Sequence, residues 1–235
     1  MNDMKNFDKF LNDKDFLAYI EQIIPEGKKQ KIADVLPYRT RHITVVTENV
    51  LNSNNANAIL RTAEALGIQE AHIVYGNIKY IPQKSVSKGA HLWMDLHHYD
   101  KASENNAQTC IDFLKQRGYQ IVITSPNGKN DIHEINLQQP VALCLGQESK
   151  GLSNTFTNNA DIQIAIPQFG FTESYNVAVA AGMLLLPLIE KLHSTNVNWE
   201  MSKEEKEILY KKWILSYPKS VDEHYKRYYE KRFSL

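Results

Sequence analysis

The sequence has no excess of charge of either sign. Its 235 residues include 27 Lys and Arg against 27 Asp and Glu, so the formal net charge is zero. The overall basic excess that marks many nucleic-acid-binding proteins is absent, and any such binding must rely on local patches. Cysteine is also scarce: Cys110 and Cys144 stand in apolar surroundings without CxxC spacing. They are typical of small core residues in a reducing compartment rather than of a disulfide or a zinc pair.

Signals for export and membrane insertion are missing as well. The N-terminal stretch has acids scattered through it and no long apolar run, so it does not resemble a signal peptide. No stretch reaches the roughly 18 consecutive apolar residues of a membrane helix. We therefore expect a cytoplasmic protein with no membrane partner.

Several common cofactor and catalytic motifs are absent. No two glycines stand two positions apart, which excludes a GxGxxG loop, and there is no GxxxxGK[ST], HExxH or GxSxG. The eight histidines show no zinc spacing, and His97 and His98 would face opposite sides of a strand. We expect neither a dinucleotide nor a metal.

Three regions differ in their hydrophobic pattern. Residues 1–42 and 196–235 show helical spacing, with a capping box at Ser202 and Glu205. Residues 43–195 alternate short β-rich runs with amphipathic helices, which predicts an α/β domain with a mostly parallel sheet, flanked by helical extensions at both ends. The predicted strands are Ile43–Thr47, His72–Tyr75, Met94–His97, Gln120–Thr124, Val141–Leu145 and Ile162–Ile166. The predicted helices of this domain are Asn57–Leu66, Lys101–Arg117 and Asn176–His193.

Polar residues gather in three loops that follow predicted strands, where open α/β sheets bind their ligands. The first loop runs from Asn52 into a helix that contains Arg61. An asparagine there is an ordinary helix cap. Arg61 offers five donors to a phosphate or carboxylate, and a structural salt bridge is the alternative.

The second and third loops follow buried strands. In the second, a strand runs into Gly146-Gln147-Glu148, where a ligand could approach the backbone closely, or Glu148 could simply close a turn. In the third, Pro167 leads through Gly170 to Ser174-Tyr175-Asn176 and a helix of small residues. Ser174 or Asn176 could cap that helix, or the loop amides could hold a polar ligand.

Together and in this order, the three loops resemble the three motifs of the SpoU RNA 2′-O-methyltransferases of the SPOUT superfamily. The lead-in Tyr38-Arg-Thr-Arg41-His-Ile-Thr and the Gly-Gln-Glu form of the second loop most resemble the tRNA guanosine-18 enzymes. The resemblance implies a deep trefoil knot, S-adenosylmethionine as cofactor, and a homodimer. By position, it implies catalytic roles for Asn55, Arg61, Glu148, Ser174 and Asn176, and cofactor contacts at Thr124, Gly146, Ile166 and Tyr175. Three residues of the third loop, Phe169, Phe171 and Glu173, depart from what the resemblance leads us to expect there.

The implied reaction leaves the role of Arg61 open. An arginine, with a pKa above about 12, is an awkward base for a ribose hydroxyl. It could instead steer an RNA phosphate and stabilise the developing alkoxide, or it could lose its proton transiently.

The expected RNA surface is the basic cluster before the sheet domain, and the C-terminal tail with its tyrosines either joins it or packs on the protein. A dimer surface is predicted on the small residues of the last helix of the domain. Two alternative functions stay open: an rRNA methyltransferase and a catalytically inactive RNA-binding assembly factor. The cluster consists of Lys28, Lys29, Lys31, Arg39 and Arg41, and the dimer surface of Val177, Ala178, Ala180, Ala181 and Leu184.

Overall fold

The computed structural model describes residues 7–50, 52–75, 84–101, 105–126 and 128–233. The chain divides into two compact units. The sheet unit is Thr40–Trp199, and the helical unit joins Met1–Arg39 with Glu200–Leu235.

The sheet unit is built on six parallel strands in the order β3-β2-β1-β5-β4-β6. All six predicted strands are confirmed, with ends that move by no more than two residues. Their bounds are Ile43–Glu48 (β1), Glu70–Val74 (β2), Asp95–Tyr99 (β3), Gln120–Thr124 (β4), Val141–Leu145 (β5) and Ile162–Ile164 (β6).

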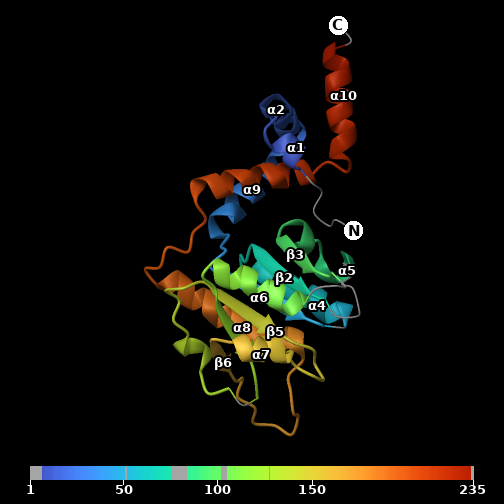
Figure 1. The fold of residues 1–235 in the computed structure, drawn as a ribbon. Helices are drawn as coiled ribbons and strands as arrows, with labels where there is room; N and C mark the ends of the chain where they lie inside the picture. The colour runs from blue at the N-terminus through green and yellow to red at the C-terminus, as the bar shows by residue number, and fades with distance from the viewer. Residues whose placement is uncertain (1–6, 51, 76–83, 102–104, 127, 234–235) are drawn as a thin grey trace. The chain divides into compact units, whose positions relative to one another are not determined.

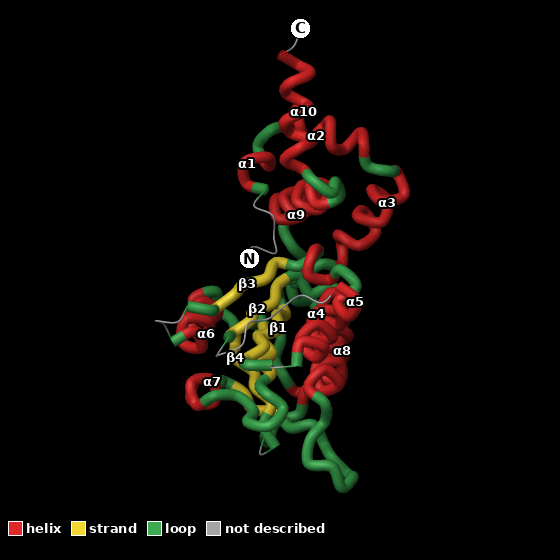
Figure 2. Tube along the Cα trace, turned by 90° about the vertical axis from the view of Figure 1, so that its right-hand side faces the viewer, coloured by secondary structure: helices red, strands yellow, loops and turns green. Residues whose placement is uncertain are grey.

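Helices cover both faces of this sheet (Figure 1). In Figure 2, α4 (Ser53–Ala65) and α8 (Val177–Ser194) lie on one face, and α6 (Asn106–Gln116) and α7 (Asn154–Asn159) on the other. Every residue of β1 and β5 is buried, because both faces of these central strands are covered. The predicted start of α6 falls partly on residues 102–104, which lie outside the described residues. Short helices complete the unit: α5 (Lys84–Ser87), η2 (Ala90–Leu92) and η3 (Ile132–Glu134).

The helix α8 is strongly apolar. By length and mean hydropathy (1.4 over 18 residues) it could cross a membrane, although the run is interrupted by Pro187, Glu190 and Lys191. Its buried side belongs to the hydrophobic core of the sheet unit, together with residues of β1, β5 and α4. We therefore assign α8 as a core helix.

The predicted dimer surface on α8 needs correction. Val177, Ala181 and Leu184 are buried in the core of their own chain. The apolar side chains that α8 exposes are instead Val179, Met183 and Leu186, at 54%, 42% and 47% exposure. The helix has two apolar sides, and the sequence does not show which of them meets the sheet.

The helical unit brings the two ends of the chain together. It contains α1 (Asp8–Leu11), α2 (Lys14–Ile23), α3 (Glu26–Val35), η1 (Leu36–Tyr38), α9 (Lys203–Ser216) and α10 (Val221–Phe233). The predicted capping box of α9 is confirmed by reciprocal hydrogen bonds between Ser202 and Glu205.

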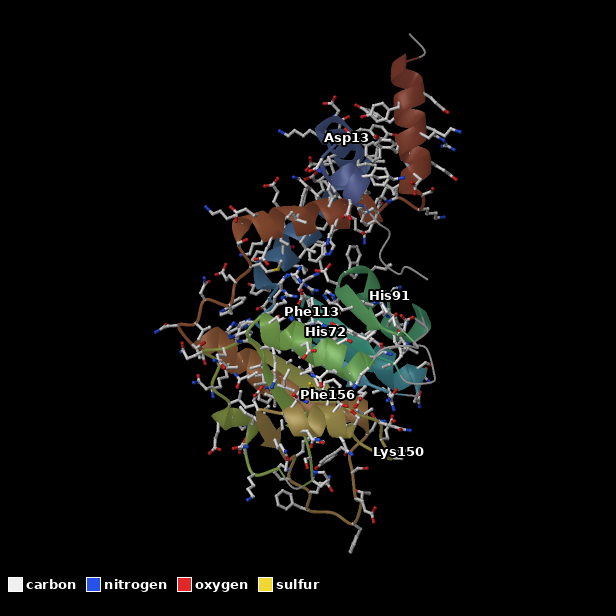
Figure 3. All side chains as sticks on the ribbon, viewed as in Figure 1. Asp13, His72, His91, Phe113, Lys150 and Phe156 are labelled. Atoms are coloured by element: carbon white, nitrogen blue, oxygen red, sulfur yellow. The ribbon has the colours of Figure 1, made fainter. Side chains whose placement is uncertain are left out.

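Aromatic rings from both ends of the chain form the centre of the helical unit. Tyr225 lies 5.0 Å from Phe10 and 4.8 Å from Phe16 between ring centroids. The hydroxyl of Tyr229 donates to Asp13, the N-cap of α2 (Figure 3). These C-terminal tyrosines thus pack within the unit. Of the two roles that the sequence leaves open for the tail, RNA contact or packing on the protein, this is the second.

Candidate active site

Three of the predicted cofactor positions follow neighbouring strands. Thr124 ends β4, Gly146 follows β5 and Ile166 follows β6, and these strands are adjacent in the sheet. The segment after β4 is held against β6, because the Ser125 amide donates to the Ile164 carbonyl at 2.9 Å. The carboxyl ends of the three strands therefore form one edge with three loops above it.

The second loop is closed tightly on itself. The Gln147 amide donates to the Gly151 carbonyl at 3.1 Å, and the Gly151 amide donates back at 2.8 Å. A Cβ at Gly146 would lie 2.3 Å from the Gly151 carbonyl carbon. Only glycine fits at that point. The exposed Lys150 projects from this loop (Figure 3).

Asn55 joins all three loops. Its amide nitrogen donates to Glu148 of the second loop. Its amide oxygen accepts from Asn176 at 3.1 Å. Asn176 is also the N-cap of α8, where its side chain accepts from the Ala178 and Val179 amides. The structure thus brings together three of the five predicted catalytic residues, from segments up to 121 positions apart.

We call Asn55, Glu148 and Asn176 the hub of the site. The other two predicted catalytic residues lie apart from it. Arg61 is exposed on α4, about 9 Å further along the helix axis than Asn55. Ser174 is exposed in the third loop. Among the residues that the structure describes, neither side chain has a hydrogen-bond or ion-pair partner.

Arg61 lies instead beside an open groove. The groove has a volume of about 530 Å³ and a mostly apolar lining contributed by α4, α5 and α8. Its lining residues are Ala58, Arg61, Thr62, Ala65, Leu66, Val86, Gly182 and Leu186. An exposed guanidinium over such a groove is free to meet an anion or a second molecule.

The third loop is ordered at its base and exposed at its tip. The Tyr175 hydroxyl donates to the Pro167 carbonyl at 3.0 Å, which ties the two ends of the loop together. Phe169 and Phe171 project fully into solvent, at 98% and 108% exposure. These bulky departures from the expected pattern therefore fill no space in their own chain.

Glu48 is a positioning residue that the sequence analysis missed. It ends β1, is only 3% exposed, and accepts a hydrogen bond from the Ser153 amide at 2.7 Å. Ser153 is the N-cap of α7, so Glu48 fixes the far end of the second loop to the central strand. An acid at the end of an apolar strand was the one available signal.

The predicted basic cluster is only partly a surface. Lys28 and Lys31 are exposed, and Lys29 pairs with Glu26 at 3.0 Å. Arg39 is fully buried, with its guanidinium 5.5 Å from the centre of the Trp213 ring.

Arg41 is also engaged within the protein. It forms ion pairs with Glu70 and, at 2.5 Å, with Asp95. Both arginines are thus held in contacts of the fold, and the candidate RNA surface narrows to the three lysines.

A parallel α/β unit with polar loops joined at one sheet edge is the architecture of an α/β enzyme that binds its ligand beyond the strand ends. Residues 42–186 match the SpoU rRNA Methylase family. Since this match covers more than half of the chain, the protein belongs to the SpoU methylase family. It is an RNA methyltransferase that depends on S-adenosylmethionine, and its fold implies a trefoil knot.

Individual relatives extend the likeness beyond that region. The tRNA (guanosine(18)-2′-O)-methyltransferase of Borreliella burgdorferi is 33% identical over 191 residues, which is 81% of this chain and 85% of the relative. The enzyme of the same name from Thermus thermophilus is 34% identical over 68% of this chain and 80% of its own. The solved structure of the A. aeolicus TrmH/SpoU tRNA modifying enzyme superposes with a TM-score of 0.71 at 29% identity, covering 80% of this chain and 95% of that one.

The strand-end loops suit S-adenosylmethionine. The Thr124 hydroxyl, the Gly146 backbone and the half-buried Ile166 combine polar and apolar surface at one edge. The Gly146 turn lets the chain fold back within contact distance of Gly151, where any side chain would collide. These residues would hold the cofactor, and the Tyr175 hydroxyl ties the base of the third loop to Pro167.

Proposed function

We propose that this enzyme methylates the ribose 2′-oxygen of guanosine 18 in transfer RNA, in the cytoplasm. The observation that carries the proposal is the length of the likeness to the Borreliella burgdorferi enzyme. Its 191 aligned residues exceed the family region 42–186. The similarity therefore includes part of the flanking helices, where enzymes with the same fold can differ in substrate.

The reaction requires an in-line displacement at a methyl carbon. S-adenosylmethionine supplies that carbon on a sulfonium sulfur, which keeps the electron pair of the broken bond. Asn55, Glu148 and Asn176 hold the three loops in register, and alignment of this kind contributes several kcal/mol. Ser174 orients the ribose.

Arg61 acts as a charged stabiliser in this proposal. Its exposed guanidinium binds the phosphate next to the reacting ribose and stabilises the negative charge that develops on the 2′-oxygen. The proton of the hydroxyl passes to that phosphate. The absence of a partner for Arg61 among the described residues supports this role, since an arginine in a structural salt bridge would be occupied.

The enzyme works as a homodimer through the exposed side of α8. Val179, Met183 and Leu186 form an apolar surface there, and Gly182 allows close approach of a second helix. Gly182 and Leu186 of this surface also line the groove beside Arg61, so a second copy docked there would complete the surroundings of the catalytic arginine.

Light scattering tests the dimer. Met183→Asp should give a monomer with little activity, while Ile208→Asp, an equally exposed apolar position on α9, should leave the dimer intact. A wild-type protein that is monomeric at micromolar concentration and fully active would contradict this part of the proposal.

Lysines of α3 supply phosphate contacts. With zero net charge over the chain, binding cannot rest on a broad electrostatic field. Replacing Lys28, Lys29 and Lys31 with Gln should reduce the slope of log affinity against log salt by about 2 to 3, without changing cofactor affinity. An unchanged slope would make these lysines a solvated helix face. The control removes three other lysines: Lys9, Lys115 and Lys211.

Mapping of ribose methylation in total RNA from a deletion strain tests the substrate. We expect loss of one modification, at position 18 of transfer RNA. Loss from ribosomal RNA instead would keep the chemistry and change the substrate. No loss anywhere, together with cofactor binding without transfer, would indicate an RNA-binding assembly factor.

A further inference from the structure

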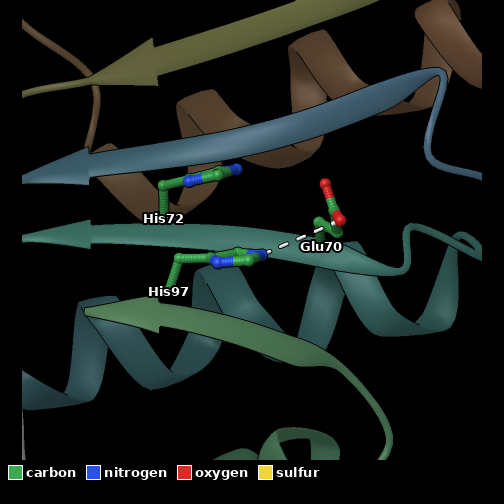
Figure 4. A group of neighbouring side chains, drawn as sticks. All are labelled: Glu70, His72 and His97. Atoms are coloured by element: carbon green, nitrogen blue, oxygen red, sulfur yellow. Dashed lines mark ion pairs between the residues drawn. The ribbon is translucent and has the colours of Figure 1, made fainter. Parts of the chain in front are cut away.

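Three potential metal ligands meet on one face of the sheet. Strands β2 and β3 pair in parallel so that His72 lies directly opposite His97. Glu70 is two residues before His72 and therefore points to the same face. One ligand atom from each residue lies within 4.8 Å of the others. Figure 4 shows both rings extending in the same direction, with their nitrogens toward the Glu70 carboxylate.

Each imidazole has a nitrogen without a hydrogen-bond partner. His72 is fully buried and His97 is partly exposed, and within the described part of the chain neither Nε2 atom has a hydrogen bond. Nε2 of His97 lies 3.7 Å from the Glu70 carboxylate, an ion-pair contact that the dashed line in Figure 4 marks. Native proteins rarely leave buried polar atoms unpaired. The rings stack 4.7 Å apart at 11°, beside Phe113 of α6 (Figure 3). Burial, followed by the neighbouring His97, lowers the pKa of His72 to about 3, so its lone pair is available at neutral pH.

We propose that Glu70, His72 and His97 bind a divalent transition-metal ion of the zinc class. Two imidazoles and one carboxylate are a common ligand set for zinc, with bonds of about 2.0 to 2.2 Å. Tetrahedral bonds of that length put the ligand atoms roughly 3.4 Å apart, so atoms now within 4.8 Å need to close by up to about 1.4 Å. The two nearly parallel rings must also turn toward each other, because a bound ion lies near the plane of each imidazole. The His97 side chain is 33% exposed, so an ion and a water as fourth ligand would enter from that side once the ring turns.

An outer partner already orients the buried ligand. The Tyr99 hydroxyl lies 3.0 Å from Nδ1 of His72. Protein ligands to zinc commonly use their second ring nitrogen in this way, which fixes the tautomer and directs Nε2 toward the metal. The ion would join the edge strand β3 to β2.

Two arginines, Arg41 and Arg117, would compete with the metal for the Glu70 carboxylate. Burial raises the pKa of Glu70, but the His97 ring, Arg41 and Arg117 outweigh it and lower that pKa to about 2, so the carboxylate is charged. Arg41 is shared with Asp95, whereas Arg117 donates to Glu70 at 3.2 Å from a side chain that is 36% exposed. The metal therefore displaces Arg117, which can turn into solvent.

Titration of the purified, chelator-treated enzyme with Zn²⁺ and with Co²⁺ tests the site. We expect one equivalent to bind, with the visible absorption of tetrahedral Co²⁺ carrying nitrogen ligands. His97→Gln should raise the Kd by more than about tenfold, and Tyr99→Phe by about tenfold. Arg117→Gln should lower the Kd by about tenfold, because the competing cation is gone.

His98→Gln is the matched control. His98 is the next residue of β3, exposed, and bonded to Tyr75 on the opposite side of the strand. It should bind metal as the wild type does. Equal binding by His97→Gln and His98→Gln, or no stoichiometric binding by the wild type, would overturn the proposal. Because the readout is metal affinity, its failure is independent of the methyltransferase assignment.

Discussion

Replacement of Gly146 by alanine adds one methyl group, which should disrupt the second loop. The new Cβ would lie 2.3 to 2.4 Å from three backbone atoms of Gly151 and Leu152, against an ordinary contact distance of 3.4–4 Å. Backbone atoms cannot swing aside as a side chain can, so the loop must open by about 1 Å. That movement breaks the two hydrogen bonds between Gln147 and Gly151, which contribute about 1 kcal/mol each.

Overpacking adds about 1 kcal/mol or more to the loss of the two hydrogen bonds, so the substitution should cost about 3 kcal/mol of free energy in total. If this cost falls on the folded state alone, the melting temperature should fall by about 6 to 12 °C. If S-adenosylmethionine must close the opened loop again, its affinity should fall on the order of 100-fold. Calorimetry measures both quantities. Gly27→Ala is the control, since its Cβ would meet nothing within 4 Å. A Gly146→Ala variant with wild-type melting temperature and cofactor affinity would refute the reasoning.

Three further predictions concern the hub, the arginine and acid stability. Asn55→Ala removes two hydrogen bonds between loops and should lower kcat/KM by about 10- to 30-fold, with a milder loss in Glu148→Gln, which keeps an acceptor. Arg61→Ala and Arg61→Lys should both abolish transfer in single-turnover assays but leave cofactor binding intact, because lysine lacks the planar fork; substantial turnover in either would remove the arginine from catalysis. In the presence of a chelator, the buried neutral His72, whose pKa is lowered to about 3, should make the free energy of unfolding fall by about 2 kcal/mol from pH 6.5 to 4.5, since only the unfolded chain takes up the proton there. Glu70, with its lowered pKa, adds a loss of the same sign below about pH 4.5; urea titrations that show a flat profile would contradict both.

The strands were predictable because each is a short β-rich run between turn residues. Their order was not, since nothing local to β5 shows that it pairs with β1 and β4. The meeting of Glu70, His72 and His97 depends on the register of two strands and has no counterpart in linear spacing.

The site was predictable only in part, for the same reason. Asn55, Glu148 and Asn176 meet as the motif order implies. The distance of Arg61 from that hub follows from helix geometry, because six residues correspond to about 9 Å of rise and a turn to another side of the helix. Which side of α8 faces the core depends on the sheet it packs against, so the exposed Val179 could not be told from its buried neighbours.

The most direct test of the account is methylation of transfer RNA by the purified enzyme with a labelled methyl donor. Two substrates should be compared, one with guanosine and one with 2′-deoxyguanosine at position 18, followed by nuclease digestion and mass spectrometry. The account predicts one methyl group on the 2′-oxygen of guanosine 18 and none in the deoxy substrate. Equal labelling of both substrates would contradict it.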